Sequence, residues 1–151
     1  MARFPDPPHA HIPGQTPRHP EGTFDALCET ARPEQPCGAV FASDAWRAGL
    51  QFFDTGYFWE AHEVWEAVWM ALPGGSDEKR LVQGMIQLAN ACLKRRMQRP
   101  RAVQRLCEIC GRQLDGLPSS LWITSGLREE QIRNQLSKLG QSGTAHPSNA
   151  L

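Results

Sequence analysis

The stretch Tyr57–Leu72 constrains the fold of this chain more than any other segment. Placed on a helix at about 100° per residue, its apolar side chains cover roughly half of the helix surface. A helix this apolar is expected to be the central helix of a core. The same stretch also carries His62, Glu63 and Glu66 among its aromatic residues. An imidazole and carboxylates within an aromatic frame indicate a site.

Helical patterns precede and follow this central stretch. Ser43 and Ser76 are good N-caps, each followed by acidic residues where the helix dipole favours anions, and Pro100 suits a first turn. The sequence shows no strand-like alternation and no internal repeat. It predicts an all-α chain, a helical bundle of about five helices with short antiparallel connections. Besides the central helix, the expected helices are Ser43–Asp54, Asp77–Gln98, Pro100–Gly116 and Leu127–Leu139, with short pieces at Thr23–Ala31 and Leu121–Ile123.

Composition divides the 151 residues into three parts around one domain. Residues 1–42 form an N-terminal arm that holds most of the prolines, which exclude a long helix there. The arm fits either a flexible tail or an extended segment laid over the helical body. Residues 43–140 are the predicted helical bundle domain. Residues 141–151 are expected to be a flexible tail.

Charge and cysteine content narrow the possible partners and the compartment. With 16 basic and 16 acidic residues, no net field draws the chain to nucleic acid or to a membrane. The basic cluster Lys94–Arg105 is interpreted as a solvated face near a helix end, with contact to phosphate or RNA as the alternative. Five cysteines without a regular framework indicate a reducing, cytoplasmic location, and Cys107 and Cys110 are expected in the core. No stretch approaches the roughly 18 apolar residues of a membrane span.

His62 and Glu66 lie one turn apart and share one face of the central helix, whereas Glu60 is expected on the solvent side. If the next helix packs antiparallel to this one, its own polar stripe comes opposite the pair. Because buried polar groups need hydrogen-bond partners, the two stripes are expected to support each other. The side chains expected to frame the site and to hold a cofactor or substrate are Trp59, Trp69, Gln83 and Gln87.

Binding of one divalent ion, zinc, manganese or iron, is the first chemistry that fits this pattern. His62 and Glu66 have the i, i+4 spacing of ligands on a zincin-like helix, and Glu63 would be the catalytic base that activates a bound water. Two protein ligands are too few, so a third must come from elsewhere. The arm offers His9, His11 and His19, of which His19 is the predicted third ligand.

Two other interpretations need no metal. In one, His62 and a neighbouring carboxylate act as general acid and base on a small substrate. In the other, His62 and Glu66 are a structural core pair hydrogen-bonded to the glutamines of the next helix. The sequence thus predicts a metal-dependent hydrolase acting on an unknown small molecule, or a non-enzymatic helical module that assembles with itself or with a partner.

At these residues the chain resembles the all-helical prokaryotic family called domain of unknown function three hundred and nine. The hallmark of that family, H-x-x-x-E-x-x-W, corresponds here to His62, Glu66 and Trp69, and the helix Leu81–Ala89 is similar to the family's glutamine-and-glycine helix. The resemblance covers about residues 43–115. It implies a helical bundle and a motif suggested to bind metal or to act in catalysis, without a substrate. One departure is Gln98, where related members have glycine at the helix end.

Overall fold

The computed structural model describes residues 3–144, and within this range α-helices are the only regular secondary structure. The all-α prediction is confirmed. The five longer helices correspond to the predicted bundle. Two of the three short helices lie at the two short pieces that were predicted, and the third, Cys37–Val40, was not predicted. None of the described helices is long and apolar enough to cross a membrane. The helices are α1 (Asp25–Cys28), α2 (Cys37–Val40), α3 (Asp44–Asp54), α4 (Phe58–Ala71), α5 (Asp77–Arg96), α6 (Pro100–Leu114), α7 (Ser119–Ser125) and α8 (Glu129–Thr144).

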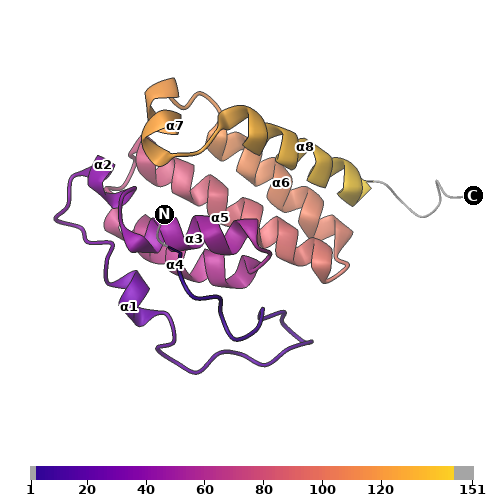
Figure 1. Cartoon of the computed structure of the whole chain (residues 1–151). Helices are drawn as coiled ribbons and strands as arrows, with labels where there is room; N and C mark the ends of the chain where they lie inside the picture. The colour runs from indigo at the N-terminus through magenta and orange to yellow at the C-terminus, as the bar shows by residue number, and fades with distance from the viewer. Residues whose placement is uncertain (1–2, 145–151) are drawn as a thin grey trace, which may run out of the picture.

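Consecutive long helices pack against one another, α3 on α4, α4 on α5 and α5 on α6, and α8 then packs on α6 (Figure 1). The arm before α1 runs past α3 and α4 on the side away from α8 (Figure 1). The last helix extends to Thr144, beyond the predicted end at Leu139, and residues 145–151 of the predicted flexible tail lie outside the described residues. Because the arm runs past α3 and α4, it is the segment that can cover α4.

The helix boundaries follow from local capping chemistry. The Ser43 hydroxyl accepts a hydrogen bond from the Trp46 backbone N–H at 3.3 Å, and the Ser76 hydroxyl accepts one from Lys79 at 3.1 Å. Each serine thereby satisfies an N–H group that has no partner inside the helix. Pro100 is the first residue of α6, where its missing N–H costs nothing. The three predicted helix starts are confirmed.

The core is built around α4, as the apolar character of this helix predicts. Trp65 is fully buried, and its indole Nε1 donates a hydrogen bond to the Trp46 carbonyl oxygen at 3.3 Å. Gly49 of α3 lies directly under the Trp65 ring, where a larger residue would meet the indole. Cys107 and Cys110 of α6 are also buried in the core, which confirms the prediction that they lie there.

The C-terminus of α5 has the hydrogen bonds of a Schellman motif. The Arg99 N–H donates to the Lys94 carbonyl and the Gln98 N–H donates to the Arg95 carbonyl, each at 3.0 Å. The motif places its C′ residue in the left-handed region, and Gln98 has φ 60°. Among the described residues, Gln98 is the only residue other than glycine with positive φ. The departure from glycine noted in the sequence thus falls at a strained position.

Replacing Gln98 by glycine is therefore expected to stabilise the protein by about 0.5–1 kcal/mol. Glycine adopts positive φ without the steric cost that a β-carbon incurs, although it loses more backbone entropy on folding. Urea unfolding of the two proteins measures the difference in free energy. Gln98→Ala is the matched control, because alanine keeps the β-carbon and should give no such gain.

Candidate functional site

Two histidine–glutamate pairs meet on α4, and they differ sharply in exposure. The His62 Nε2 atom lies 2.8 Å from Glu66 Oε2, with 21% of the histidine and 53% of the glutamate side chain exposed. The His19 Nε2 atom of the arm lies 2.6 Å from Glu60 Oε2, and these side chains are 2% and 0% exposed. Solutes can therefore reach the first pair, whereas the second is enclosed.

Glu60 does not face solvent, so the prediction for this residue was wrong. Its Oε2 accepts a hydrogen bond from the His11 backbone N–H at 2.7 Å and also contacts the His19 imidazole. The arm covers the face of α4 that carries Glu60. Glu60 stands one turn before buried Val64, and the arm next to it is rich in histidine; these were the signals in the sequence that Glu60 is buried. Buried carboxylates require partners of this kind.

Trp59 lies between the two pairs. Its ring centroid is 4.9 Å from that of His11, 5.8 Å from that of His19 and 6.4 Å from that of His62. His9 stacks on His19 at 4.5 Å, which extends the cluster along the arm. The indole is thus fixed on both sides by imidazoles, and it links the enclosed pair to the accessible one.

The hydrogen bonding of His62 defines its tautomer. Nδ1 is buried and has no hydrogen-bond partner among the described residues, whereas Nε2 faces the Glu66 carboxylate. A carboxylate accepts hydrogen bonds and does not donate them. In the neutral imidazole the proton therefore lies on Nε2, between the nitrogen and Glu66, and Nδ1 is bare. The proton shared by this pair is the one that a solute at the surface of α4 could exchange.

The structure does not bring the predicted third ligand to the pair. His19 contacts Glu60 instead, and among the described residues no three His, Cys, Asp or Glu side chains are grouped to hold a metal ion. A metal on His62 Nε2 would also move the ring proton to Nδ1, which has no acceptor, although ligating histidines normally donate that N–H. His62 and Glu66 thus supply two converging ligand atoms, and the described residues do not complete a metal site.

Glu63, the predicted base, lines a groove between the arm and α4. No hydrogen bond or ion pair joins its carboxylate to the described part of the chain. The thiol of Cys28 lies 4.0 Å from the Glu63 carbonyl oxygen, and burial, together with the Glu63 carboxylate, raises the pKa of Cys28 to about 11. Cys28 is therefore a neutral thiol at physiological pH and not a nucleophile. The other side chains of the groove include Arg18, His19, Phe24, Asp25 and Trp59.

The remaining predicted residues lie elsewhere on α4 and α5. The ammonium of Lys79 lies 3.9 Å from the centroid of the Trp69 ring. Trp69 and Gln83 also line a separate groove near the α4–α5 turn. Gln87 is half-buried. Within the described range no hydrogen bond joins either glutamine to His62 or Glu66. The geometry thus puts Trp59 beside the pair and leaves the glutamines without the expected contact to it.

Comparison with known proteins gives a family for the central part of the chain. Residues 46–106 match the model of the family described as Domain of unknown function (DUF309). The matched segment contains all of α4 and α5, and therefore His62, Glu66 and Glu60. No curated protein and no solved structure matches the chain. The resemblance inferred from the H-x-x-x-E-x-x-W motif is thereby confirmed, and over residues 46–106 the chain resembles the DUF309 family.

Proposed function

We propose that the face of α4 around His62 is a catalytic site for a small polar substrate, and that the reaction is hydrolysis. The observation that supports this proposal is the exposure of the His62–Glu66 pair. A core strut would enclose both side chains, whereas 53% of the Glu66 side chain is exposed while its oxygen still holds the imidazole at 2.8 Å. A histidine whose ring is fixed by a hydrogen bond to a carboxylate, and which solutes can reach, is suited to proton transfer.

The three polar residues have separate roles in this proposal. Glu66 orients the His62 ring and stabilises the positive charge that the ring carries when both of its nitrogens are protonated. Glu63, whose carboxylate is free in the neighbouring groove, removes a proton from the attacking water. His62, in its positively charged form with protons on both ring nitrogens, donates the Nε2 proton to the leaving group and becomes neutral. Glu63 then releases to solvent the proton that it took from water, and His62 is protonated again before the next turnover. Trp59 forms the wall that connects the groove with the pair.

Binding of a divalent ion at the same pair is a second candidate, favoured by the convergence of His62 Nε2 and Glu66 Oε2 on one point. Zinc, manganese or iron would take these two atoms as protein ligands, and calorimetric titration of the metal-free protein with each ion tests this. Equal heats from wild type and His62→Gln would exclude it.

A reducing cytoplasmic location is also part of the proposal. The five cysteines are free, which supports it.

The non-enzymatic alternative needs a large apolar surface for a partner or a second copy. Among the described residues, the exposed large hydrophobic side chains are Met70 and Ile123, on α4 and α7. Two such side chains offer little support for an assembly module. Sedimentation velocity of the whole chain would measure whether a stable homo-oligomer forms.

We expect His62→Gln and Glu66→Gln each to lower kcat/KM by at least about 100-fold, because general acid–base groups contribute roughly 10²–10⁴-fold. A panel of chromogenic carboxylic and phosphoric esters identifies the substrate class with the wild-type protein, and the variants are then compared on the best substrate. The melting temperature should change by no more than about 4 °C, since exposed ion pairs contribute roughly 0–1 kcal/mol.

Glu130→Gln, an exposed carboxylate on α8, is the control and should retain full activity. Variants of the pair that keep activity would contradict the proposal. A large fall in melting temperature without a specific loss of activity would instead identify the pair as a structural element. Both outcomes are measured on the same preparations.

A further inference from the structure

A third groove lies where the start of α4, the end of α5 and the face of α8 meet, and it contains no residue of the His62–Glu66 site. Its volume is about 510 Å³, within the range of small-molecule sites. Its apolar surface comes from Phe58, Cys92 and Leu139, and its cations are Arg95, Arg96 and Lys138. Among the described residues, no Asp or Glu lines this groove. In a chain of zero net charge, this is a local concentration of positive charge.

The three cations differ in what already holds them. Arg96 donates from Nη1 to the Gly56 carbonyl oxygen at 2.6 Å, and its guanidinium lies 4.6 Å from the centroid of the Phe58 ring. Arg95 and Lys138 are exposed and form no hydrogen bond or ion pair with the described residues. Arg96 is thus part of the wall, while two positive charges, one on α5 and one on α8, are free for a ligand.

The apolar side chains of the groove, Phe58, Cys92 and Leu139, are half-buried or buried. Burial raises the pKa of the Cys92 thiol to about 12 even though Arg95 and Arg96 act in the opposite direction. A neutral thiol beside an aromatic ring and a leucine provides a surface for an apolar body. The ligand that fits therefore has two parts, an anionic one and an apolar one.

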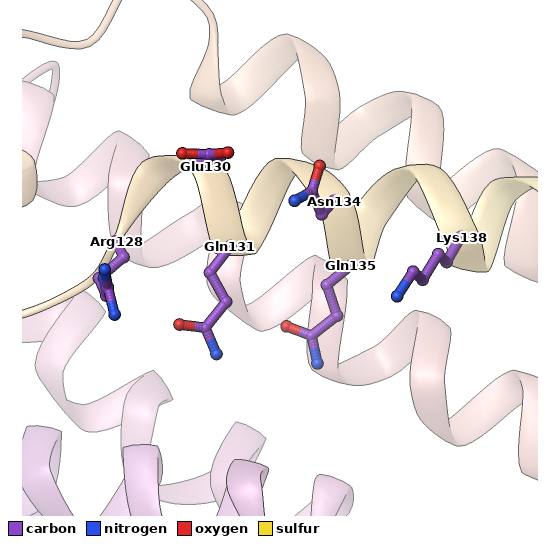
Figure 2. Close-up of a pocket in the computed structure, with 6 residues that line it drawn as sticks. All are labelled: Arg128, Glu130, Gln131, Asn134, Gln135 and Lys138. Atoms are coloured by element: carbon purple, nitrogen blue, oxygen red, sulfur yellow. The ribbon is translucent and has the colours of Figure 1, made fainter.

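The polar side of the groove continues along α8. Figure 2 shows the side chains of Gln131, Gln135 and Lys138 pointing to the same side of this helix, with Arg128 at its start, while Glu130 lies on a different side. These residues, including Glu130, line a neighbouring depression along α8, and Gln135 and Lys138 border both this depression and the groove. Amide groups next to cations supply the hydrogen-bond donors that phosphate oxygens accept.

We propose that this groove binds a phosphate monoester with an aromatic or aliphatic body. A phosphate monoester carries a charge of about −1.5 to −2 at pH 7, which matches the two free cations better than a singly charged carboxylate does. Arg95 and Lys138 bind the phosphate from opposite walls. The body of the ligand lies against Phe58 and Leu139.

Isothermal titration of the whole chain with phenyl phosphate tests the proposal, with inorganic phosphate, benzoate and a single-stranded oligonucleotide as comparison ligands. We expect Arg95→Gln and Lys138→Gln each to weaken phenyl phosphate binding about tenfold or more, as for loss of one charged hydrogen bond. Inorganic phosphate and benzoate should each bind at least about tenfold more weakly than phenyl phosphate. Arg101→Gln, an exposed cation on α6, is the matched control and should leave the affinity unchanged.

Three results would overturn the proposal. Equal weakening by Arg101→Gln would mean that the attraction is non-specific charge. Equal affinities for phenyl phosphate and inorganic phosphate would mean that the apolar surface contributes nothing. Much tighter, strongly salt-dependent binding of the oligonucleotide would assign the cations to a polyanion instead. Because Arg95 and Lys138 are exposed, their variants are expected to fold, and circular dichroism verifies this.

Discussion

Replacing Glu60 by leucine is expected to lower the free energy of unfolding by about 3–5 kcal/mol, the cost of removing one partner from a buried ion pair. The carboxylate is fully enclosed and holds the arm through His11 and His19. Its loss leaves a backbone N–H and an imidazole nitrogen buried without an acceptor, and each such group carries a desolvation cost. Urea unfolding followed by tryptophan fluorescence measures the change.

Glu66→Leu is the matched control for Glu60→Leu. It makes the same substitution on the same helix, also opposite a histidine, but at a side chain that is 53% exposed. Its expected cost is at most about 1 kcal/mol. Glu60→Gln keeps an oxygen acceptor and should fall between the two. Similar costs for the two leucine variants would show that enclosure by the arm does not govern the strength of these pairs.

Gly49→Ala is expected to destabilise the protein by about 1–3 kcal/mol, the usual cost of overpacking a core. On propensity alone, alanine in the interior of a helix would instead stabilise by up to about 1 kcal/mol. The difference in sign arises because the added β-carbon would overlap the fully buried indole of Trp65. The indole also donates to the Trp46 carbonyl, so it cannot move without losing that hydrogen bond.

Gly111→Ala in α6 is the control for this substitution. There the nearest atom to a new β-carbon is a methyl group of Leu136 at 3.9 Å, an ordinary van der Waals contact. The melting temperatures of the wild type and of both alanine variants are compared. Gly111→Ala should be neutral or slightly stabilised. In the background of Trp65→Phe, which lacks the indole nitrogen, Gly49→Ala should cost less stability than it does in the wild type. If Gly49→Ala and Gly111→Ala shift the melting temperature alike, Trp65 does not control the approach of α3 to α4.

The long helices could be predicted because their signals are local. Ser43, Ser76 and Pro100 act through groups within four residues of themselves, so neither the partner helices nor the arm is needed to recognise them. The central position of α4 likewise follows from the amount of apolar surface that it must bury.

The environment of the site could not be predicted in the same way. Glu60 looks exposed on a helical wheel because the wheel contains no arm, and its partners lie 41 and 49 residues away. His19 was expected at His62 for its chemistry alone, whereas a deeply buried carboxylate stands closer to it in the fold. The pairing of His62 with Glu66 needs only one helical turn, and the sequence does place these two side chains on the same face.

The indole of Trp46 has a consequence for how the chain reaches this fold. Its Nε1 donates to the Ser125 carbonyl oxygen at 2.8 Å across 79 residues. During synthesis α3, α4 and α5 can form and pair early, but this buried donor has no acceptor until the chain has extended past α6. Contacts of such sequence separation close late and slow the final step. We therefore expect the last stage of folding to be the docking of the α7 turn onto α3.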